Sequence, residues 1–347
     1  MAGSGDAHLR DPGSSLLRVE HLVVEFNAGR GRKVRAVTDV SLDILEGETL
    51  GLVGESGCGK STTGRAIIQL PAPTSGRVIF EGHDVTGAKG DTMRHLRTRM
   101  QMIFQDPISS LNPRRKVEDI VREGLDIWKI GDAAARKQRV NELLDTVGLD
   151  PEAVRGRRPF QFSGGQCQRI SIARAVATDP KLIICDEPVS ALDVSVQAQI
   201  LNLLEDMKGR YKLTMLFIAH DLAVVKNISD RVAVMYLGKL CEVGHPDDIY
   251  AAPAHPYTAG LLRSIPVPDP EVRPEDRPTI TGEIPSPIAP PSGCRFRTRC
   301  DRAQDRCAIE EPIIREVAPG QFVACHFPLV GDVAPMPAET PVAVSAG

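Results

Sequence analysis

The sequence predicts an α/β fold with a parallel sheet at its core, and three observations support this prediction. Segments with strand patterns alternate along the chain with segments whose apolar residues have helical spacing. A glycine-rich loop at 54–61 lies between an apolar strand and a helix. A second apolar strand, at 182–185, ends in two adjacent carboxylates. Parallel sheets bind their ligands at the edge where such strands end.

In the first half of the chain, the apolar pattern predicts strands first and helices later. The predicted strands are 17–26, 36–44, 47–54 and 76–85, the third of them fully buried. Helical spacing, with apolar residues three and four apart, is found in 60–70, 117–128 and 134–149. The mostly helical pattern between about 110 and 160 indicates a helical insert.

The second half returns to alternating strands and helices. Strands are predicted at 181–185, 214–219 and 230–244, with a helix at 195–211. Prolines multiply beyond residue 252, which marks a boundary. The predicted organisation is a disordered lead-in at 1–16, a main domain at 17–255, a small loop-rich C-terminal domain at 256–330 and a disordered tail at 331–347.

Composition excludes several classes of protein. The 347 residues are 42% hydrophobic, which is ordinary for a soluble protein with a core, and the net charge is -3. This charge gives no overall attraction to nucleic acid, which we do not expect as a partner. Residues 1–16 lack the apolar stretch of a signal peptide, and no window approaches about eighteen uninterrupted apolar residues. We therefore expect a chain that does not span a membrane and that works in a reducing compartment.

The glycine-rich loop "GESGCGKS" has the spacing G-x-x-x-x-G-K-[ST] of a phosphate-binding loop. Its glycines let successive backbone N–H groups face a phosphate, Lys60 reaches the outer phosphates, and Ser61 is a ligand for Mg²⁺. The alternative is a glycine-rich turn that contains a lysine by chance. The predicted ATP-binding residues are Gly54, Glu55, Ser56, Gly57, Cys58, Gly59, Lys60, Ser61 and Thr62.

The stretch "LIICDE" supplies the acidic groups that nucleotide hydrolysis needs. Asp186 and Glu187 follow a buried strand, and we expect Asp186 to hold Mg²⁺ through water and Glu187 to polarise the attacking water. Two solvated carboxylates in a turn are the alternative. Together with Lys60, the pair indicates nucleoside triphosphate hydrolysis by in-line attack.

A second glycine pair opens a predicted helix at "SGGQ". Ser163 is expected to cap this helix, and Gly164 and Gly165 let a phosphate approach the backbone before Gln166. One nucleotide needs only one such cradle, and Lys60 already marks it. We therefore expect the second cradle to serve a nucleotide held by another subunit.

With these motifs, residues 18–260 resemble the ATP-binding subunits of ABC transporters. "GESGCGKS" corresponds to Walker A, "FSGGQ" to the signature and "LIICDE" to Walker B. The Q-loop, the D-loop and the switch histidine correspond to Gln105, to Ser190, Ala191, Leu192 and Asp193, and to His220. The resemblance implies a P-loop NTPase fold of the ABC type, with a mixed sheet core, an antiparallel β part and a helical subdomain at about 105–165.

The resemblance also implies roles for single residues. Two such chains would face each other, with each ATP between the Walker A of one and the signature of the other. Gln105 would contact Mg²⁺ and the attacking water, and His220 would contact the γ-phosphate, although a lone histidine is more often a satisfied core residue. Phe26 would stack on adenine, the alternative being a core aromatic at a strand end.

Other segments resemble the oligopeptide/dipeptide importer branch, which also contains nickel and glutathione importers. The phrase "PSGC" at 291–294 is typical of the appendix of this branch. The resemblance implies a bacterial peptide importer whose ATPase lies on the cytoplasmic face of the membrane. Implied partners are a second ATPase subunit, with a heterodimer favoured over a homodimer, two membrane-spanning permease subunits and an extracytoplasmic solute-binding protein. A soluble ABC ATPase of translation or repair is the alternative. Phe162 and Cys167 depart from the usual signature context.

Four of the eight cysteines are concentrated near the C-terminus, as C-x5-C-x6-C-x17-C. Four thiolates in a loop-rich segment suit tetrahedral sulfur coordination, and the irregular spacing favours a 4Fe–4S cluster over zinc. Free thiols are the third alternative, and His326 is a possible substitute ligand. A cluster here would be structural or would regulate the ATPase by redox. The predicted ligands are Cys294, Cys300, Cys307 and Cys325.

Two further expectations concern cysteines in the main domain. Cys185 and Cys241 lie in strand patterns and are expected to be buried and inert. Cys58 lies in the phosphate loop, where a positive local field is expected to favour the thiolate. Alkylation of Cys58 is expected to block ATP binding, and ATP to protect it.

Overall fold

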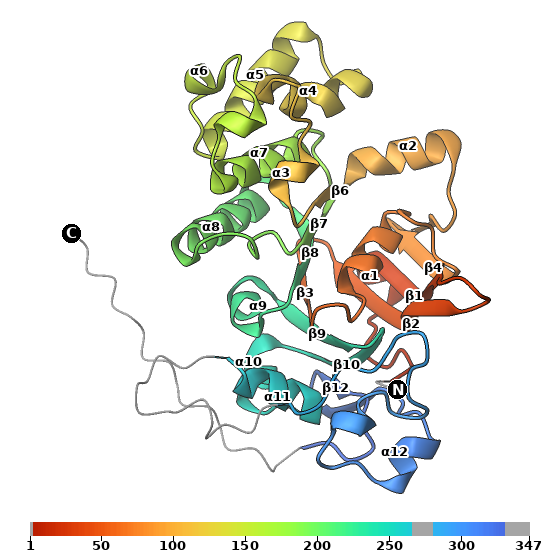
Figure 1. Ribbon diagram of the computed structural model, residues 1–347. Coiled ribbons are helices and arrows are strands. Elements are labelled where there is room, and N and C mark those ends of the chain that lie inside the picture. The colour runs from red at the N-terminus through yellow and green to blue at the C-terminus, as the bar shows by residue number, and fades with distance from the viewer. Residues whose placement is uncertain (1–2, 266–279, 330–347) are drawn as a thin grey trace, which may run out of the picture.

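The computed structural model describes residues 3–265 and 280–329, and two β-sheets form its frame (Figure 1). The smaller sheet is antiparallel, with the strand order β2-β1-β4-β5. Its strands are β1 (Ser15–Asn27), β2 (Lys33–Leu45), β4 (Ser75–Phe80) and β5 (His83–Asp84). This sheet contains the first, second and fourth strands predicted from the sequence, and it is the predicted antiparallel part.

The larger sheet has the order β11-β12-β10-β9-β3-β8-β7-β6 among the described residues. From β9 to β6 neighbouring strands are parallel, whereas β10, β12 and β11 are added in antiparallel orientation. The strands are β3 (Thr49–Val53), β6 (Met100–Ile103), β7 (Leu182–Asp186), β8 (Thr214–Ala219), β9 (Arg231–Tyr236), β10 (Lys239–Gly244), β11 (Arg315–Ala318) and β12 (Gln321–Val323). The predicted mixed α/β sheet is confirmed.

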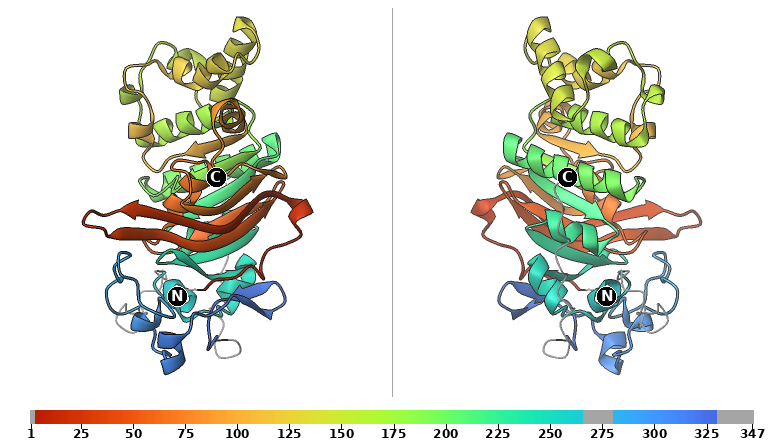
Figure 2. Two further views of the ribbon diagram at one scale, coloured as in Figure 1. Left: turned by 90° about the vertical axis from the view of Figure 1, so that its right-hand side faces the viewer. Right: turned by 90° about the vertical axis from the view of Figure 1, so that its left-hand side faces the viewer.

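Helices cover the larger sheet, and the helical subdomain lies at one end of the molecule (Figure 1, Figure 2). The predicted span 105–165 contains α3 to α6. The helices are α1 (Lys60–Ile67), α2 (Gly90–Arg99), α3 (Pro107–Ser110), α4 (Val117–Ile127), α5 (Ala133–Thr146), α6 (Pro151–Val154), α7 (Gly164–Val176), α8 (Val194–Tyr211), α9 (Leu222–Ile228), α10 (Pro246–Ala251), α11 (Pro256–Arg263) and α12 (Asp305–Ile309). Short 3-10 turns occupy Pro12–Ser14, Pro159–Gln161 and Arg297–Arg299.

Strand β7 shows how the sheet is buried on both faces. Successive side chains of a strand point to opposite faces. Leu182 and Ile184 join the core that contains the smaller sheet and α1, whereas Ile183 and Cys185 join the core with α4, α7 and α8. All five residues of β7 are buried, so the strand reads as a continuous apolar run that ends at Asp186.

The lead-in predicted to be disordered is packed against the protein from residue 3 onward. The Gly3 N–H donates to the carbonyl of Leu240 at 2.8 Å. His8 is buried, with Nε2 2.8 Å from the Ser41 carbonyl oxygen. The prediction of disorder is therefore wrong for residues 3–14, because contacts with strands more than thirty residues away leave no local sequence pattern. The predicted disordered tail at 331–347 lies outside the described residues.

The C-terminal segment continues the larger sheet. Strand β12 pairs with β10, with Glu242 opposite Val323, and Val323 and Ala324 are fully buried. The segment predicted as a small separate domain therefore shares a sheet and a core with the main domain. Within 3–265 and 280–329, no helix has the length and apolar character to cross a bilayer.

Candidate nucleotide site

The phosphate loop lies between β3 and α1, as predicted. Gly59 has φ = 109°, and a Cβ added there would lie 2.3 Å from the carbonyl oxygen of Ala36, so only glycine fits. The loop wraps around Lys60, whose Nζ donates to the carbonyl oxygens of Gly54 at 2.7 Å and Glu55 at 3.1 Å. The Lys60 side chain is only 3% exposed. The carbonyl oxygens of the phosphate loop therefore surround the ammonium group of Lys60.

The two groups assigned to Mg²⁺ lie side by side. Ser61 Oγ donates to Asp186 Oδ1 at 2.5 Å, across the 125 residues that separate them in sequence. The Asp186 side chain is fully buried, and Arg65 Nη2 lies 3.3 Å from its other oxygen. A buried carboxylate needs such partners, because removing it from water is costly. A hydroxyl and a carboxylate together form a suitable oxygen donor set for Mg²⁺.

Glu187 is the point at which the predicted catalytic residues meet. Its backbone has φ = 47°, an uncommon conformation that concentrates at functional sites, and its N–H donates to the Ile218 carbonyl at 3.0 Å. Gln105 Nε2 donates to Glu187 Oε2 at 2.9 Å, and His220 Nδ1 lies 3.4 Å from the same oxygen. Lys60 Nζ is 3.9 Å from Oε1. Residues from three separate segments thus surround the Glu187 carboxylate at the edge of the sheet.

The residues of the D-loop follow this carboxylate directly. Ser190 Oγ donates to the Glu187 carbonyl at 3.1 Å, and Leu192 is partly buried. Asp193 precedes α8 without capping it through its side chain, and the next residue, Val194, is 81% exposed. A small pocket beside the D-loop is lined by Glu187, Val189, Ser190, Gln197, Ala219, His220, Asp221 and Val224.

The signature residues form a regular helix start on α7. Ser163 Oγ accepts from the Gln166 N–H at 3.3 Å, and Gln166 Oε1 accepts from the Ser163 N–H at 3.0 Å, which is a capping box. Among the described residues, no hydrogen bond or ion pair joins 163–166 to the phosphate loop. Figure 1 shows α7 with the helical subdomain and α1 against the smaller sheet. The structure does not bring the two predicted phosphate cradles together in one chain.

Phe26 lies at the end of β1 and is 42% exposed. The structure thus does not place it in the core, which removes the alternative considered from the sequence. An exposed aromatic ring at a strand end is available for stacking.

The prediction that Cys58 carries a lowered pKa is wrong. Its side chain is 2% exposed, and burial raises the pKa of the thiol to about 11, although the Lys60 ammonium lies 4.0 Å from Sγ and opposes this effect. Desolvation therefore outweighs the positive field. Cys185 and Cys241 are fully buried, which confirms the predicted burial of both. Burial raises the pKa of Cys185 to about 12 and that of Cys241 well above its usual value, which favours the neutral thiol at both positions.

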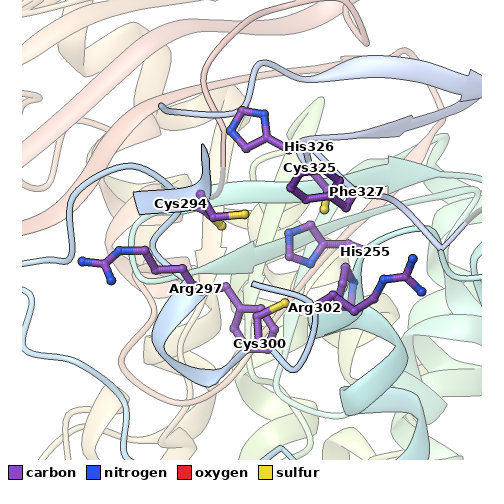
Figure 3. Close-up of a pocket in the computed structure, with 11 residues that line it drawn as sticks. His255, Cys294, Arg297, Cys300, Arg302, Cys325, His326 and Phe327 are labelled. Atoms are coloured by element: carbon purple, nitrogen blue, oxygen red, sulfur yellow. The ribbon is translucent and has the colours of Figure 1, made fainter. Parts of the chain in front are cut away.

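The four C-terminal cysteines line one pocket (Figure 3). His255, Pro256, Phe296, Arg297, Arg302, His326 and Phe327 complete its wall. All four cysteines are free thiols, and burial raises the pKa of Cys300 to about 11 and that of Cys325 to about 12. His326 Nε2 is 3.0 Å from the Glu310 carbonyl oxygen, so that nitrogen already has a partner. Within residues 3–265 and 280–329, no group of three or more His, Cys, Asp or Glu side chains is arranged to hold a metal ion.

The fold and the site together define a P-loop ATPase, in which the phosphate loop, the acidic strand end and a histidine meet at one edge of a sheet. The chain belongs to the ABC transporter family. Residues 37–190 match the ABC transporter family, and residues 241–307 match the oligopeptide/dipeptide transporter C-terminal region.

Similarity to individual relatives extends over most of the chain. The chain is 51% identical over 310 residues to the oligopeptide transport ATP-binding protein OppF of Salmonella typhimurium. The alignment covers 86% of this chain and 92% of the relative. The chain is 50% identical over 296 residues to the oligopeptide transport ATP-binding protein AppF of Bacillus subtilis, covering 85% and 90%. A solved dimeric ATP-binding cassette, MJ0796 bound to ADP and Pi, is similar with a TM-score of 0.61 and 27% identity, covering 66% of this chain and 98% of that chain. The chain is thus an ATP-hydrolysing subunit of the ABC type.

Proposed function

We propose that this chain hydrolyses ATP to power the import of peptides through a membrane transporter. The observation that carries the proposal is the match of residues 241–307 to the oligopeptide/dipeptide transporter C-terminal region, in a chain that also has the complete nucleotide motif set. The names of the relatives OppF and AppF support oligopeptides as the substrate class. Import of nickel or glutathione and work on ribosomes or nucleic acid are the alternatives.

The proposed ATP site uses the groups gathered around the phosphate loop. The backbone N–H groups of 54–62 bind the phosphates, Lys60 turns from the loop carbonyls toward the outer phosphates, and Phe26 stacks on adenine. Ser61 and Gln105 would hold Mg²⁺ directly and Asp186 through water. Bound Mg²⁺ neutralises charge that develops on the phosphate oxygens.

Glu187 is the proposed general base of the hydrolysis. Its carboxylate accepts the hydrogen bond of Gln105 and faces His220, so both side chains orient it. A positioned carboxylate that accepts a proton from water increases the rate of in-line attack on the γ-phosphate. The His220 side chain is 54% exposed, so its ring can contact both Glu187 and a bound phosphate.

The proposed working unit contains a second ATPase subunit. The signature residues stand at the start of α7, which Figure 1 shows apart from α1 and the phosphate loop before it. This separation supports contact of Ser163, Gly164, Gly165 and Gln166 with a nucleotide held by the partner. The solved relative MJ0796 is a dimer. We favour a heterodimer, bound at the cytoplasmic face of the membrane to two permease subunits that receive a solute-binding protein. Ile108 and Phe160, which are 60% and 69% exposed on the helical subdomain, support contact with the permeases.

The proposed function is tested on the chain assembled with its permease subunits in liposomes, with the solute-binding protein added outside. We expect a peptide-loaded binding protein to stimulate ATP hydrolysis, because solute delivery and ATP turnover are coupled in an importer. Stimulation by nickel or glutathione alone would assign a different solute. Co-purification with ribosomes in place of permease subunits would contradict the proposal.

We infer as well that Cys294, Cys300, Cys307 and Cys325 hold a 4Fe–4S cluster. This inference is supported by the pocket, because four free thiols from positions spread over 32 residues line it together. Thiolate ligands must lose their protons, so metal binding has to overcome the raised pKa values of Cys300 and Cys325. It also has to rearrange side chains that, in the described residues, are not arranged around a metal ion. A short segment rich in proline gains folding free energy from such a centre.

The cluster is tested by iron, sulfide and zinc analysis of protein purified without oxygen. We expect about four irons and four sulfides per chain, with a broad visible absorption band that is lost in Cys300→Ser. Cys167→Ser, a buried cysteine outside the pocket, is the matched control and should keep the iron. Zinc alone would make the centre a structural zinc site, and the absence of any metal would contradict the inference.

A further inference from the structure

An arginine of residues 294–325, here called the cysteine-containing segment, contacts the phosphate loop. Arg299 precedes Cys300, and its guanidinium forms two hydrogen bonds with the carboxylate of Glu55, Nη1 to Oε2 at 2.7 Å and Nη2 to Oε1 at 2.9 Å. The Arg299 side chain is 5% exposed and that of Glu55 is 22% exposed. A paired arrangement of this kind fixes orientation as well as distance, and the burial of Arg299 limits screening by water.

Glu55 is held through its backbone as well. Its N–H donates to the hydroxyl of Tyr257 on α11 at 2.9 Å. The Tyr257 ring packs on Tyr236 with centroids 4.7 Å apart, and both rings pack on Phe296, at 5.3 and 5.2 Å. Phe296 lines the cysteine pocket. Aromatic contacts from Phe296 to Tyr257, followed by the hydrogen bond between Tyr257 and Glu55, thus connect the cysteine pocket to the loop.

A second route runs from Cys294 to the same loop. The next residue, Arg295, is fully buried and donates through Nη1 to the carbonyl of Leu237, in the turn between β9 and β10. In that turn, the Gly238 N–H donates to the Cys58 carbonyl at 2.7 Å. The residues next to two of the four cysteines therefore support the phosphate loop from two sides.

We propose that Arg299 is a positioning residue for ATP, which holds the phosphate loop through Glu55 and makes nucleotide affinity depend on the fold of the cysteine-containing segment. The inference rests on the proposed nucleotide site and adds to it a residue from outside the recognised nucleotide motifs. Without the ion pair, the loop would have to become ordered when ATP binds, and this entropy cost would weaken binding. Glu187 and His220 are not in contact with Arg299, so turnover at saturating ATP should change little.

The experiment measures the Kd for MgATP by titration calorimetry, and KM and kcat, on the full chain. We expect Arg299→Ala to raise Kd and KM about tenfold and to change kcat by less than about twofold. Arg299→Lys should recover part of the affinity, because the ammonium group keeps the charge but cannot reproduce the two parallel hydrogen bonds of the planar guanidinium. The double variant Arg299→Ala/Glu55→Gln should have a Kd for MgATP no higher than that of the single variant with the higher Kd, because both changes break the same ion pair.

Two reference variants separate the possible failures. Arg306→Ala removes an exposed ion pair with Glu310 on the same segment and should leave Kd unchanged. Lys60→Ala should abolish ATP binding. If Lys60→Ala binds normally, the nucleotide site itself is wrong; if Lys60→Ala fails to bind while Arg299→Ala binds like the wild type, only the role of Arg299 is wrong. A loss of ATP affinity in Arg306→Ala equal to that in Arg299→Ala would also overturn the proposed role of Arg299.

A second readout reports on the loop itself and does not depend on turnover. The buried Cys58 should be alkylated slowly by iodoacetamide in the native protein and faster in Arg299→Ala, as followed by mass spectrometry of its peptide. An unchanged rate of Cys58 labelling in Arg299→Ala would overturn the proposal that Arg299 holds the phosphate loop through Glu55. Should Arg299→Ala fail to fold, Glu55→Gln removes the same charge pair from the loop side and is tested in the same way.

The dependence on the cysteine-containing segment has its own test. Cys300→Ser should weaken ATP binding in the wild-type background and have a much smaller effect in Arg299→Ala, because both changes act through one contact. Fully additive losses of affinity would show that the segment and the loop are independent and would overturn this part of the proposal.

Discussion

Glu187→Gln is expected to lower kcat for ATP hydrolysis by a factor of about a hundred to ten thousand while leaving the Kd for MgATP within about twofold. The amide keeps the size of the side chain and still accepts the hydrogen bond from Gln105. It cannot accept a proton from water, so the loss falls on the chemical step alone. Single-turnover hydrolysis and equilibrium binding, measured on the same preparation, check the two halves of the prediction.

The matched control for this variant is Glu205→Gln, which removes an exposed carboxylate of α8 and should leave kcat and Kd unchanged. Glu187 also lies 3.9 Å from Lys60, so a purely electrostatic role would appear as a change of ATP affinity. An unchanged kcat in Glu187→Gln would exclude Glu187 as the base. A large rise in Kd with unchanged kcat would show that it supports Lys60 instead.

The phosphate loop and the acidic strand end were predictable because each is encoded by a short stretch of sequence. "GESGCGKS" specifies the loop through glycine spacing, and "LIICDE" specifies a buried strand that ends in two acids. The parallel pairing of β3 with β8 and of β8 with β7 then brings Lys60 and Glu187 to one edge. The meeting of Gln105 and His220 at Glu187 rested on the resemblance, since nothing local to those residues specifies it.

The contacts that the sequence did not predict are long-range ones. The ion pair between Arg299 and Glu55 joins residues 244 positions apart, and nothing in either segment indicates the other residue as its partner. The sequence-based prediction for the Cys58 thiol fails for a related reason, because the sequence shows the nearby Lys60 but not the burial that outweighs it. Residues 3–14 and strands β11 and β12 likewise depend on partners far along the chain.

The second large effect is expected in the signature, at Gly164. Gly164 is the first residue of α7, and a Cβ added there would meet only Leu192 Cδ2, at an ordinary 3.7 Å. At Gly165 a Cβ would lie 2.7 Å from Val196 Cγ1, so substitution there would disturb packing as well. Gly164→Asp therefore adds a carboxylate at a proposed phosphate contact with little strain in the chain that carries it.

In the assembled transporter we expect Gly164→Asp to lower ATP hydrolysis about a hundredfold, because the new charge faces a phosphate where the helix start offers N–H groups. Gly164→Asn has nearly the same size without the charge and should retain much more activity. The Kd for MgATP of the isolated chain should stay within about twofold for both variants, since its own phosphate loop is untouched. If Gly164→Asp weakened ATP binding to the isolated chain as severely as Lys60→Ala, the signature would belong to the same nucleotide site as Lys60. The separation of α7 from the phosphate loop in this chain argues for the opposite result and for a site shared between two subunits.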